Sequence, residues 1–466
     1  MTTAATVAIV GAGPAGLRAA ERLVQAGLRP VLIDEAPRVG GQIYRQPPPA
    51  LQRPAATLYG FEAGKARALF DRFAALQPHV DHRPDTLVWQ VENRTLHLLQ
   101  AGQPDTLDLD ALILATGATD RVLPFPGWTM PGVFTLGAAQ VALKAQAALI
   151  GPRVVFAGTG PLLYLVAWQY TQAGGAVQAV LDTAPAGARR RALPQLLARP
   201  SVVAKGAYLL ARLTLAGVPV HQGVRLLQAD GDARVRQLHW QVGARQHITA
   251  CDAIGFGHGL RSETQLADLA GCGFAYDTLD QAWLPQRDVA GRSSVPWVYL
   301  AGDGAAIRGA DAAEAAGAAA AQALLDDLGG RTTTLPTTIT PDRHQRFREG
   351  LETLCPLPAE WAAQAPDALV VCRCEEVTAG ELRACVRDTG TQELNRLKAL
   401  TRIGMGRCQG RMCAPAAARL LADAAGCALA DVGRLRSQPP VKPVPVVAWG
   451  RAAQAATPVP AEERDD

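Results

Sequence analysis

Cysteines carry the most readable chemistry in this 466-residue sequence, because they are few and unevenly placed. All nine lie in the second half of the chain, and seven lie from Cys355 onward. Nine thiols are too sparse for a disulfide scaffold at this length. Two close pairs, Cys372 with Cys374 and Cys408 with Cys413, instead offer four soft sulfur ligands that suit iron–sulfur clusters or zinc. Ligand number alone leaves both metals open.

The context of the two pairs favours iron and sulfide. Two helical patterns fill the interval between the pairs, and the segment 401–410 contains three glycines that let backbone N–H groups turn toward sulfur. This segment resembles the 2Fe-2S domain of the bacterioferritin-associated-ferredoxin (BFD) type, in which a CxC pair and a later C-x4-C or CxxC pair bind the cluster. The resemblance implies a 2Fe-2S cluster, in preference to structural zinc, on Cys372, Cys374, Cys408 and Cys413.

A glycine-rich turn near the start of the chain predicts a nucleotide site. The apolar run 7–10 predicts a buried strand, and a helix to residue 26 and a second strand at 30–33 follow. In such a βαβ unit the first glycine allows the tight turn, the second admits a pyrophosphate and the third lets helix and strand pack. A carboxylate after the second strand binds the adenosine ribose. The residues in these roles are Gly11, Gly13, Gly16, Asp34 and Glu35, with Pro14 and Ala15 in the first helical turn.

Three later segments indicate which dinucleotide the first unit binds. The segments are Gly-Gly-Gln at 40–42, Leu-Ala-Thr-Gly at 114–117 and Tyr-Leu-Ala-Gly-Asp at 299–303. They resemble the FAD-contact segments of flavoproteins with two dinucleotide-binding domains, so the first site is expected to hold FAD. The resemblance implies that Asp303 contacts the ribityl or pyrophosphate region. The expected contacts in these segments are Gly41, Gln42, Ala115, Thr116, Gly117, Gly302 and Asp303.

A second βαβ unit lies between these segments, but its glycine pattern is incomplete. Residues 158–163 read Gly-Thr-Gly-Pro-Leu-Leu, so Leu163 stands where the third glycine belongs. A leucine there crowds the helix against the strand and narrows the approach for phosphate. Asp182 after the next strand keeps a ribose acceptor available. NAD(P), ATP or no ligand at all therefore stay open, and NAD(P)H is not the expected electron source.

The rest of the composition excludes several function classes. The formal charge of +4, from 46 basic and 42 acidic residues, gives no electrostatic reason to expect nucleic acid. No apolar stretch reaches membrane-spanning length, and we expect a cytoplasmic protein. No cysteine pair lies near either glycine turn, which argues against disulfide reduction. No set of residues suggests acid–base or nucleophilic catalysis, and His258 is expected in a loop without a catalytic role.

The order of motifs points to a narrower family. The series Gly-Gly-Gln-Ile-Tyr-Arg at 40–45, Pro-Phe-Pro-Gly-Trp at 124–128, the second glycine turn and the cluster motif resembles alpha subunits of bacterial opine oxidases, hydrogen cyanide synthase and D-hydroxyproline dehydrogenase. The match runs from about residue 7 to 446. It implies an FAD-dependent beta subunit of the D-amino-acid-oxidase type that oxidises an amine or imino acid. The resemblance also allows a small 2Fe-2S gamma subunit. Separately, it allows FMN at the contact between the alpha and beta subunits.

The expected fold class is α/β, with two Rossmann-like dinucleotide-binding domains of the glutathione-reductase type, a small helical BFD-like 2Fe-2S domain and an extended proline-rich tail. The expected boundaries are 1–120 and 262–330 for the FAD domain, 121–261 for the second nucleotide domain, 331–365 for a linker, 366–436 for the 2Fe-2S domain and 437–466 for the tail.

Three functions remain open on the sequence. The first is one component of an amine or amino-acid dehydrogenase complex, which carries electrons from its beta subunit to an acceptor. The second is a self-contained NAD(P)H-dependent flavoprotein reductase. The third is a non-catalytic scaffold that bears a cluster, against which the intact first glycine turn argues.

Overall fold

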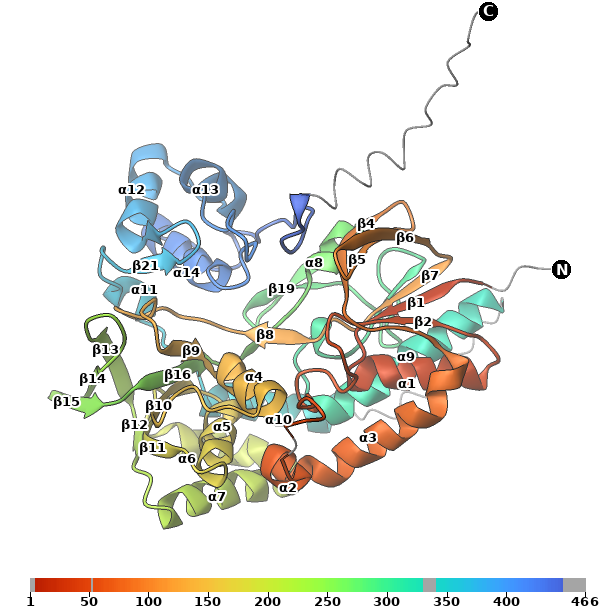
Figure 1. Ribbon diagram of the computed structural model, residues 1–466. Helices are drawn as coiled ribbons and strands as arrows, with labels where there is room; N and C mark the ends of the chain where they lie inside the picture. The colour runs from red at the N-terminus through yellow and green to blue at the C-terminus, as the bar shows by residue number, and fades with distance from the viewer. Residues whose placement is uncertain (1–4, 52, 330–340, 447–466) are drawn as a thin grey trace, which may run out of the picture.

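The chain folds into two sheet-based domains and a small helical domain (Figure 1). The computed structural model describes residues 5–51, 53–329 and 341–446. The threonine-rich part of the predicted linker, at 332–338, and the acidic end of the predicted tail lie outside the described residues.

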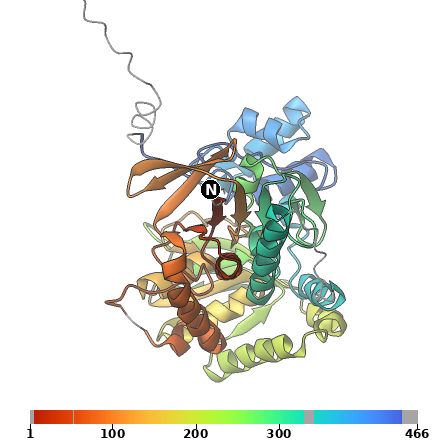
Figure 2. The same ribbon diagram turned by 90° about the vertical axis from the view of Figure 1, so that its right-hand side faces the viewer.

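The first domain is built on a five-stranded parallel sheet in the order β20-β7-β1-β2-β3. The strands are β1 (Val7–Val10), β2 (Val31–Ile33), β3 (Asp81–Arg83), β7 (Ala111–Leu114) and β20 (Val298–Leu300). One face packs against α1 (Pro14–Gln25), α3 (Ala63–Leu76) and α9 (Ala310–Leu328). Figure 2 shows α1 end-on between the other two helices. Alanine and glycine on α1 and α9 let these helices approach closely.

Antiparallel strands and a short helix cover the opposite face of this sheet. They are β4 (Thr86–Glu92), β5 (Thr95–Gln100), β6 (Gln103–Asp108) and α8 (Gln265–Leu269). The hairpin of β18 (Phe274–Asp277) and β19 (Ala282–Pro285) follows α8. Shorter helical segments are α2 (Ala55–Tyr59), η1 (Gly60–Glu62), η2 (Gln77–His79) and η3 (Gly302–Gly304).

The second domain repeats the parallel arrangement in the strand order β12-β11-β10-β16-β9. Its strands are β9 (Val133–Thr135), β10 (Arg153–Thr159), β11 (Ala176–Asp182), β12 (Val220–Gln222) and β16 (Ala253–His258). Its helices are α4 (Leu136–Gln146), α5 (Pro161–Gln172), α6 (Ala188–Leu196) and α7 (Pro200–Leu215). A separate antiparallel sheet contains β13 (Val224–Asp230), β14 (Gln237–Val242) and β15 (Arg245–Ala250). The chain crosses between the domains on the antiparallel pair β8 (Ala118–Asp120) and β17 (Leu260–Ser262).

The predicted linker differs from the structure. Within 331–365, residues Pro341–Leu354 form α10, which packs its Phe347 against Ala192 and Leu196 of α6. The apolar positions Phe347, Leu351 and Leu354 recur at helical spacing and indicate a helix. The threonine- and proline-rich sequence before them favours a linker instead, which is why the helix is missed. His258 also differs from expectation, because it ends β16 and is buried.

The third domain consists of α11 (Trp361–Gln364), β21 (Val370–Cys372), β22 (Val377–Thr378), α12 (Ala379–Thr389), α13 (Leu394–Thr401) and α14 (Ala414–Ala425). It shares one continuous hydrophobic core with the second domain. Two tryptophans secure the contact: Trp128 Nε1 donates to the Val370 carbonyl at 2.6 Å, and Trp361 Nε1 donates to the Pro124 carbonyl at 2.8 Å. The Pro-Phe-Pro-Gly-Trp motif at 124–128 is thus the surface on which the third domain docks.

The proline-rich segment 437–446 lies as an arm across the first domain (Figure 1). Val441 is buried in the first domain, and its N–H donates to the Trp89 carbonyl at 3.1 Å. Lys442 forms an ion pair with Glu35 after β2. Over the described part of the chain, no helix is both long and apolar enough to cross a membrane.

The Trp128 hydrogen bond is expected to contribute measurably to the docking of the third domain onto the second. Trp128→Phe keeps the buried ring but leaves the Val370 carbonyl without its donor, which should lower the unfolding free energy by about 1–3 kcal/mol in urea denaturation. Trp168→Phe on α5 is the control, since that ring is only partly buried and stacks with Arg212. Equal effects of the two substitutions would contradict this role for Trp128.

Candidate flavin and cluster sites

The glycine turn after β1 leaves no room for side chains. A Cβ on Gly16 would lie 1.7 Å from the Gly11 carbonyl oxygen, and a Cβ on Gly11 would lie 2.2 Å from the Ala115 carbonyl oxygen. Gly11 also has a φ of +109°, which L side chains rarely adopt. No side chain caps the N-terminus of α1, and no acidic residue lies in its first turn. The helix start is therefore free to bind an anionic pyrophosphate.

The other predicted flavin segments converge on this turn. A Cβ on Gly41 would lie 2.9 Å from the Cα of Gly13, and one on Gly302 would lie 2.8 Å from the Cβ of Ala15. Thr116 and Gly117 border Gly304 in the same way. The side chain of the remaining member, Gln42, is exposed and accepts a hydrogen bond from Arg45 at 3.0 Å. The close backbone contacts fit a dinucleotide cradle, and the role of each residue in it stays a prediction.

The two acidic residues after β2 have different surroundings. Both carboxylate oxygens of Asp34 accept backbone N–H groups, from Ala12 at 2.5 Å and Ala36 at 2.7 Å. Burial raises the pKa of Asp34. Glu35 is exposed, and its described partner is Lys442 of the arm. Asp34 therefore braces the glycine turn, and the contact of Asp34 and Glu35 with an adenosine ribose stays a prediction.

Asp303 orders the loop that precedes α9. Its Oδ1 accepts the N–H groups of Arg308 at 2.8 Å and Gly309 at 3.0 Å. Burial raises the pKa of its carboxyl group. The residue lies where the predicted flavin segments meet, and its assignment to the ribityl or pyrophosphate region stays a prediction.

The four predicted cluster cysteines come together although they are up to 41 residues apart in sequence. Cys413 hydrogen-bonds with both Cys372 and Cys408, and Cys374 with Cys408. The Cys413 contact lowers the pKa of Cys372 to about 6, with help from backbone N–H groups including that of Gly404. The same kind of contact lowers the pKa of Cys408 to about 5. The same contacts raise the pKa of Cys413, and burial raises that of Cys374. Cys372 and Cys408 are therefore the two thiols of the group that are available as thiolates.

The four-cysteine ligand set stays a prediction. Among the described residues, no three His, Cys, Asp or Glu side chains are grouped so as to hold a metal ion. A 2Fe-2S cluster needs four thiolates divided between two irons. A Cβ on Gly406 would lie 2.2 Å from the Cβ of Cys374, so the glycine lets this loop approach the first cysteine pair.

A buried ion pair that sequence reasoning missed joins the cluster loop to a flavin segment. Arg411, between the last two cysteines, donates from Nε to Glu263 at 2.7 Å, and both side chains are about seven-eighths buried, with exposures of 13% and 12%. Glu263 bonds the flavin segment through its backbone, accepting from Thr116 Oγ1 at 2.6 Å and donating to the Gly117 carbonyl at 2.9 Å. Arg411 lies in a recognisable motif, but no sequence signal marks Glu263.

The second glycine turn is occupied by the chain itself. Leu163 is fully buried in the core of the second domain. Its side chain packs α5 against the sheet and makes no place for a phosphate. Asp182 accepts hydrogen bonds from Tyr164 Oη at 2.5 Å and from the Ala184 N–H at 2.9 Å, so both its oxygens are engaged. The Cys355 thiol, just after α10, lies beside Thr159, Gly160 and Asp182, and burial raises its pKa to about 12. A nucleotide at this turn would have to displace that thiol.

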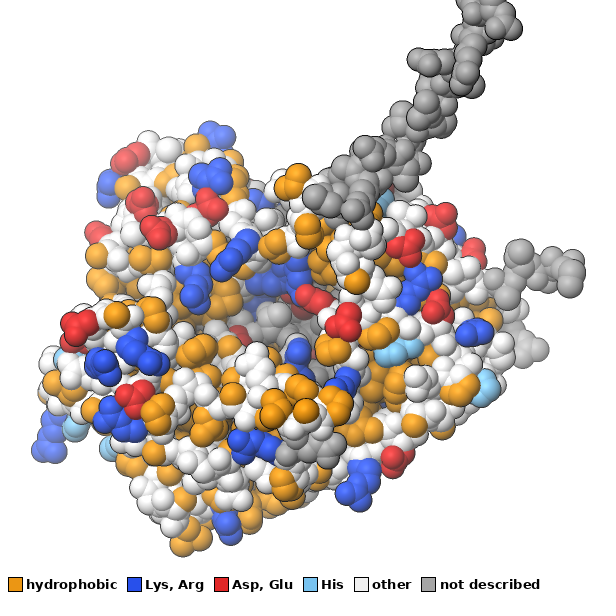
Figure 3. Space-filling view, viewed as in Figure 1, with side chains coloured by type: hydrophobic (Ala, Val, Ile, Leu, Met, Phe, Trp, Pro, Cys, Tyr) orange, Lys and Arg blue, Asp and Glu red, His pale blue; other side chains and the backbone are white. Residues whose placement is uncertain are grey.

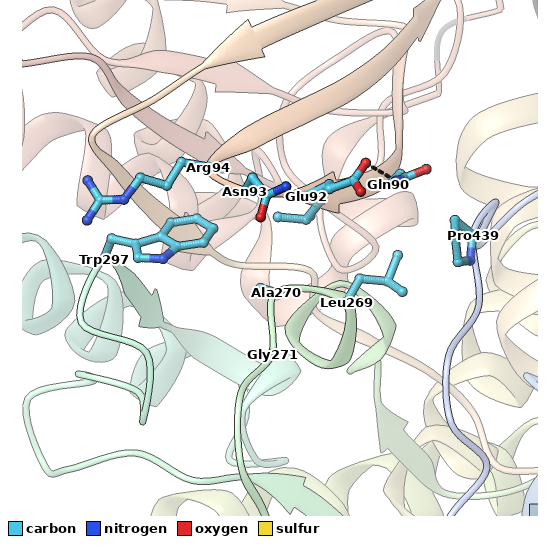
Figure 4. Close-up of a pocket in the computed structure, with 10 residues that line it drawn as sticks. Gln90, Glu92, Asn93, Arg94, Leu269, Ala270, Gly271, Trp297 and Pro439 are labelled. Atoms are coloured by element: carbon cyan, nitrogen blue, oxygen red, sulfur yellow. Dashed lines mark hydrogen bonds between the residues drawn. The ribbon is translucent and has the colours of Figure 1, made fainter.

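A surface hollow of about 470 Å³ lies away from all these residues, on the outer side of the first domain (Figure 4). It is bordered by the β4–β5 turn, the end of α8, Trp297 and Pro439 of the arm. Its carboxylate, Glu92, is hydrogen-bonded by Gln90 at 2.8 Å, and the Arg94 guanidinium lies 5.9 Å from the centre of the Trp297 ring. None of the predicted cofactor-binding residues is among the described residues that line it.

Comparison with known proteins identifies the families that the two parts of the chain match. The family model for pyridine nucleotide-disulphide oxidoreductases matches residues 5–323, and the BFD-like [2Fe-2S] binding domain matches 370–423. The opine oxidase A-subunit of Agrobacterium tumefaciens is 38% identical, over 94% of this chain and 89% of that protein. The hydrogen cyanide synthase subunit HcnB of Pseudomonas aeruginosa is 34% identical, over 95% and 97%.

The chain belongs to this oxidoreductase family, within the group of opine oxidase A and hydrogen cyanide synthase B subunits. The predicted resemblance and fold class are thereby confirmed. The L-proline dehydrogenase of P. horikoshii has the same fold, with a TM-score of 0.68 at 19% identity over 95% of this chain and 78% of that one. FAD and a 2Fe-2S cluster are the cofactors that the two family models imply.

The crowding at Gly16 predicts loss of flavin in one variant. Gly16→Ala places a methyl group against the Gly11 carbonyl, so the turn must open and FAD should dissociate from the purified protein, as measured by its visible absorption. Gly206→Ala is the control, because that glycine lies within α7 with nothing nearby. Full flavin content in Gly16→Ala would exclude the proposed geometry.

The assignment of the cluster ligands predicts the effect of replacing one of them. Cys408→Ser should abolish bound iron and sulfide while FAD stays bound, because the ligand set is separate from the flavin cradle. Iron and sulfide analysis beside flavin absorption measures both. Cys427→Ser in the same domain should keep its iron, since that residue follows α14 and lies outside the two cysteine pairs. Iron retained by Cys408→Ser would refute the ligand assignment.

Proposed function

We propose that this chain is the FAD- and 2Fe-2S-containing alpha subunit of a heteromeric amine or amino-acid dehydrogenase of the cytoplasm, with an opine, D-hydroxyproline or glycine-type substrate. A beta subunit of the D-amino-acid-oxidase type oxidises the substrate, and the alpha subunit carries the electrons to an acceptor. FMN at the alpha–beta contact and a small 2Fe-2S gamma subunit are optional parts of this proposal.

The observation that carries the proposal is the Arg411–Glu263 ion pair. It holds the loop between two predicted cluster ligands against residues 116 and 117, which belong to a predicted flavin segment. Two redox centres held this way suit electron transfer within one chain. When bound, the flavin accepts electrons in pairs and releases them singly, whereas the cluster takes one at a time.

The second domain gives no support to the alternative of an NAD(P)H-dependent reductase. Cys355 lies beside the second glycine turn, and Asp182 is already bonded by Tyr164 and Ala184. A reduced nicotinamide cofactor would have to compete with all three groups. Electrons are therefore expected from a partner subunit.

The chain's own side chains also favour oxidation in a partner. His258, beside the domain crossing, is buried, and burial lowers its pKa to about 3, so it stays neutral at ordinary pH. Arg121 and Arg419 near it lower that pKa further. His258 therefore supplies no imidazolium for acid catalysis there.

A basic rim offers a place for the partner to dock. On the face shown in Figure 3, several Lys and Arg side chains, with a few Asp and Glu side chains among them, lie around a central hollow. An acidic surface on the partner would be steered to such a rim.

The proposal is tested by isolating the complex. The tagged chain is purified from its own host under air-free conditions, and dye reduction is measured with D-hydroxyproline, glycine, sarcosine, opines and NADH. We expect one amine to reduce the dye and a second flavoprotein chain to co-purify. Reduction by NADH alone, from a preparation without a second chain, would refute the proposal and identify a reductase.

A further inference from the structure

Four arginines line a small cavity between the first and third domains. The cavity has a volume of about 130 Å³, and its walls come from β17, α8 and the β18–β19 hairpin on one side and from the cluster loop and α14 on the other. The arginines are Arg121, Arg261, Arg419 and Arg434. Aspartate and glutamate are absent from the described residues that line it, and so are the predicted flavin-contact residues.

Two of the arginines have carboxylate neighbours outside the cavity wall. Asp268 binds Arg434 through both oxygens, at 2.6 and 2.7 Å, and Glu263 lies close enough to Arg261 to raise its pKa. These two positive charges are therefore balanced within the chain, and they do not by themselves call for a ligand.

Arg121 and Arg419 are not balanced in this way. Their described hydrogen bonds go to neutral oxygens: Arg121 donates to the Asp280 carbonyl at 2.9 Å, and Arg419 to Gln281 Oε1 at 2.6 Å. The Asp280 side chain is already paired with Arg348. Glu352, the other carboxylate that influences Arg121, is paired with Arg348 as well.

Burial makes this excess of positive charge costly. Arg121 is only 6% exposed, and burial lowers the pKa of both arginines, that of Arg121 to about 10. The charge on Arg419 lowers the pKa of Arg121 further, which shows that the two repel each other. Buried charges without a partner destabilise the folded protein. An anion between the two guanidinium groups would remove that cost.

The same cavity contains polar groups without partners. Ser262 Oγ, Gln265 Oε1 and Trp283 Nε1 are buried and make no hydrogen bond within the described structure. Ser262 is 5% and Gln265 8% exposed. The Gln265 amide is held in place because its Nε2 donates to the Gln409 carbonyl at 2.7 Å, so its Oε1 requires a donor from elsewhere.

We propose that this cavity binds a small organic oxyanion, a carboxylate or phosphate, that also carries an N–H or O–H donor. Arg121 and Arg419 bind its negative group, Trp283 and Ser262 add neutral hydrogen bonds, and Gln265 accepts from its donor. Tyr276 and several leucines supply an apolar wall for its carbon atoms. This site is separate from the flavin cradle and does not depend on the function proposed above.

The test uses the purified holoprotein and three probes: lactate, inorganic phosphate and lactamide, the neutral amide of lactate. Isothermal titration calorimetry should show that at least one of the two oxyanions binds, and that lactamide binds at least tenfold more weakly. Lactate binding would identify a carboxylate site and phosphate binding a phosphate site. Binding of neither oxyanion, or equal binding of lactate and lactamide, would overturn the proposal.

Three variants locate the binding. Arg419→Gln keeps a group that can donate to Gln281 but removes the charge, so oxyanion affinity should fall about 10- to 100-fold. Arg419→Lys should retain part of the affinity because it keeps the charge. Arg387→Gln, at an exposed arginine on α12 of the same domain, should bind like the wild type. Equal affinities for Arg419→Gln and Arg387→Gln would show that the anion binds elsewhere and would overturn the proposal.

Discussion

The buried ion pair between Arg411 and Glu263 is the contact that holds the cluster loop against the predicted flavin segment at 114–117. Removing one member of a buried pair costs about 3–5 kcal/mol, because the other charge is left without a partner. Arg411 also donates to the Val441 carbonyl at 2.5 Å, so the same side chain fixes the arm. The cluster loop, the flavin segment and the arm therefore share one electrostatic anchor.

The second domain has a dinucleotide-binding type of sheet and also carries the third domain. Its glycine turn faces Cys355, and its core is continuous with that of the third domain through residues such as Phe125 and Trp128. A leucine at position 163 improves the packing of the helix at the expense of the phosphate approach. The departure from the glycine pattern thus has a structural purpose in this chain.

Sequence reasoning located the local features of both sites. The unit β1–α1–β2 follows from a contiguous pattern, and the cysteine pairs lie in motifs of a few residues. Contacts between distant residues were not accessible in that way: Glu263 and Arg411 are 148 positions apart, and neither periodicity nor motif relates them. The position of Cys355 depends on how α10 packs against α6, which the threonine-rich sequence before that helix concealed.

The arm has a consequence for biosynthesis. Glu35 meets Lys442 across 407 positions of the chain, so the predicted flavin cradle gains this neighbour only after residue 442 has left the ribosome. At roughly 5–20 residues per second, that delay is on the order of tens of seconds after the glycine turn emerges. The other predicted cradle segments, at 40–42, 114–117 and 299–303, precede Lys442 in the chain, so the arm joins a cradle whose other segments have already been synthesised.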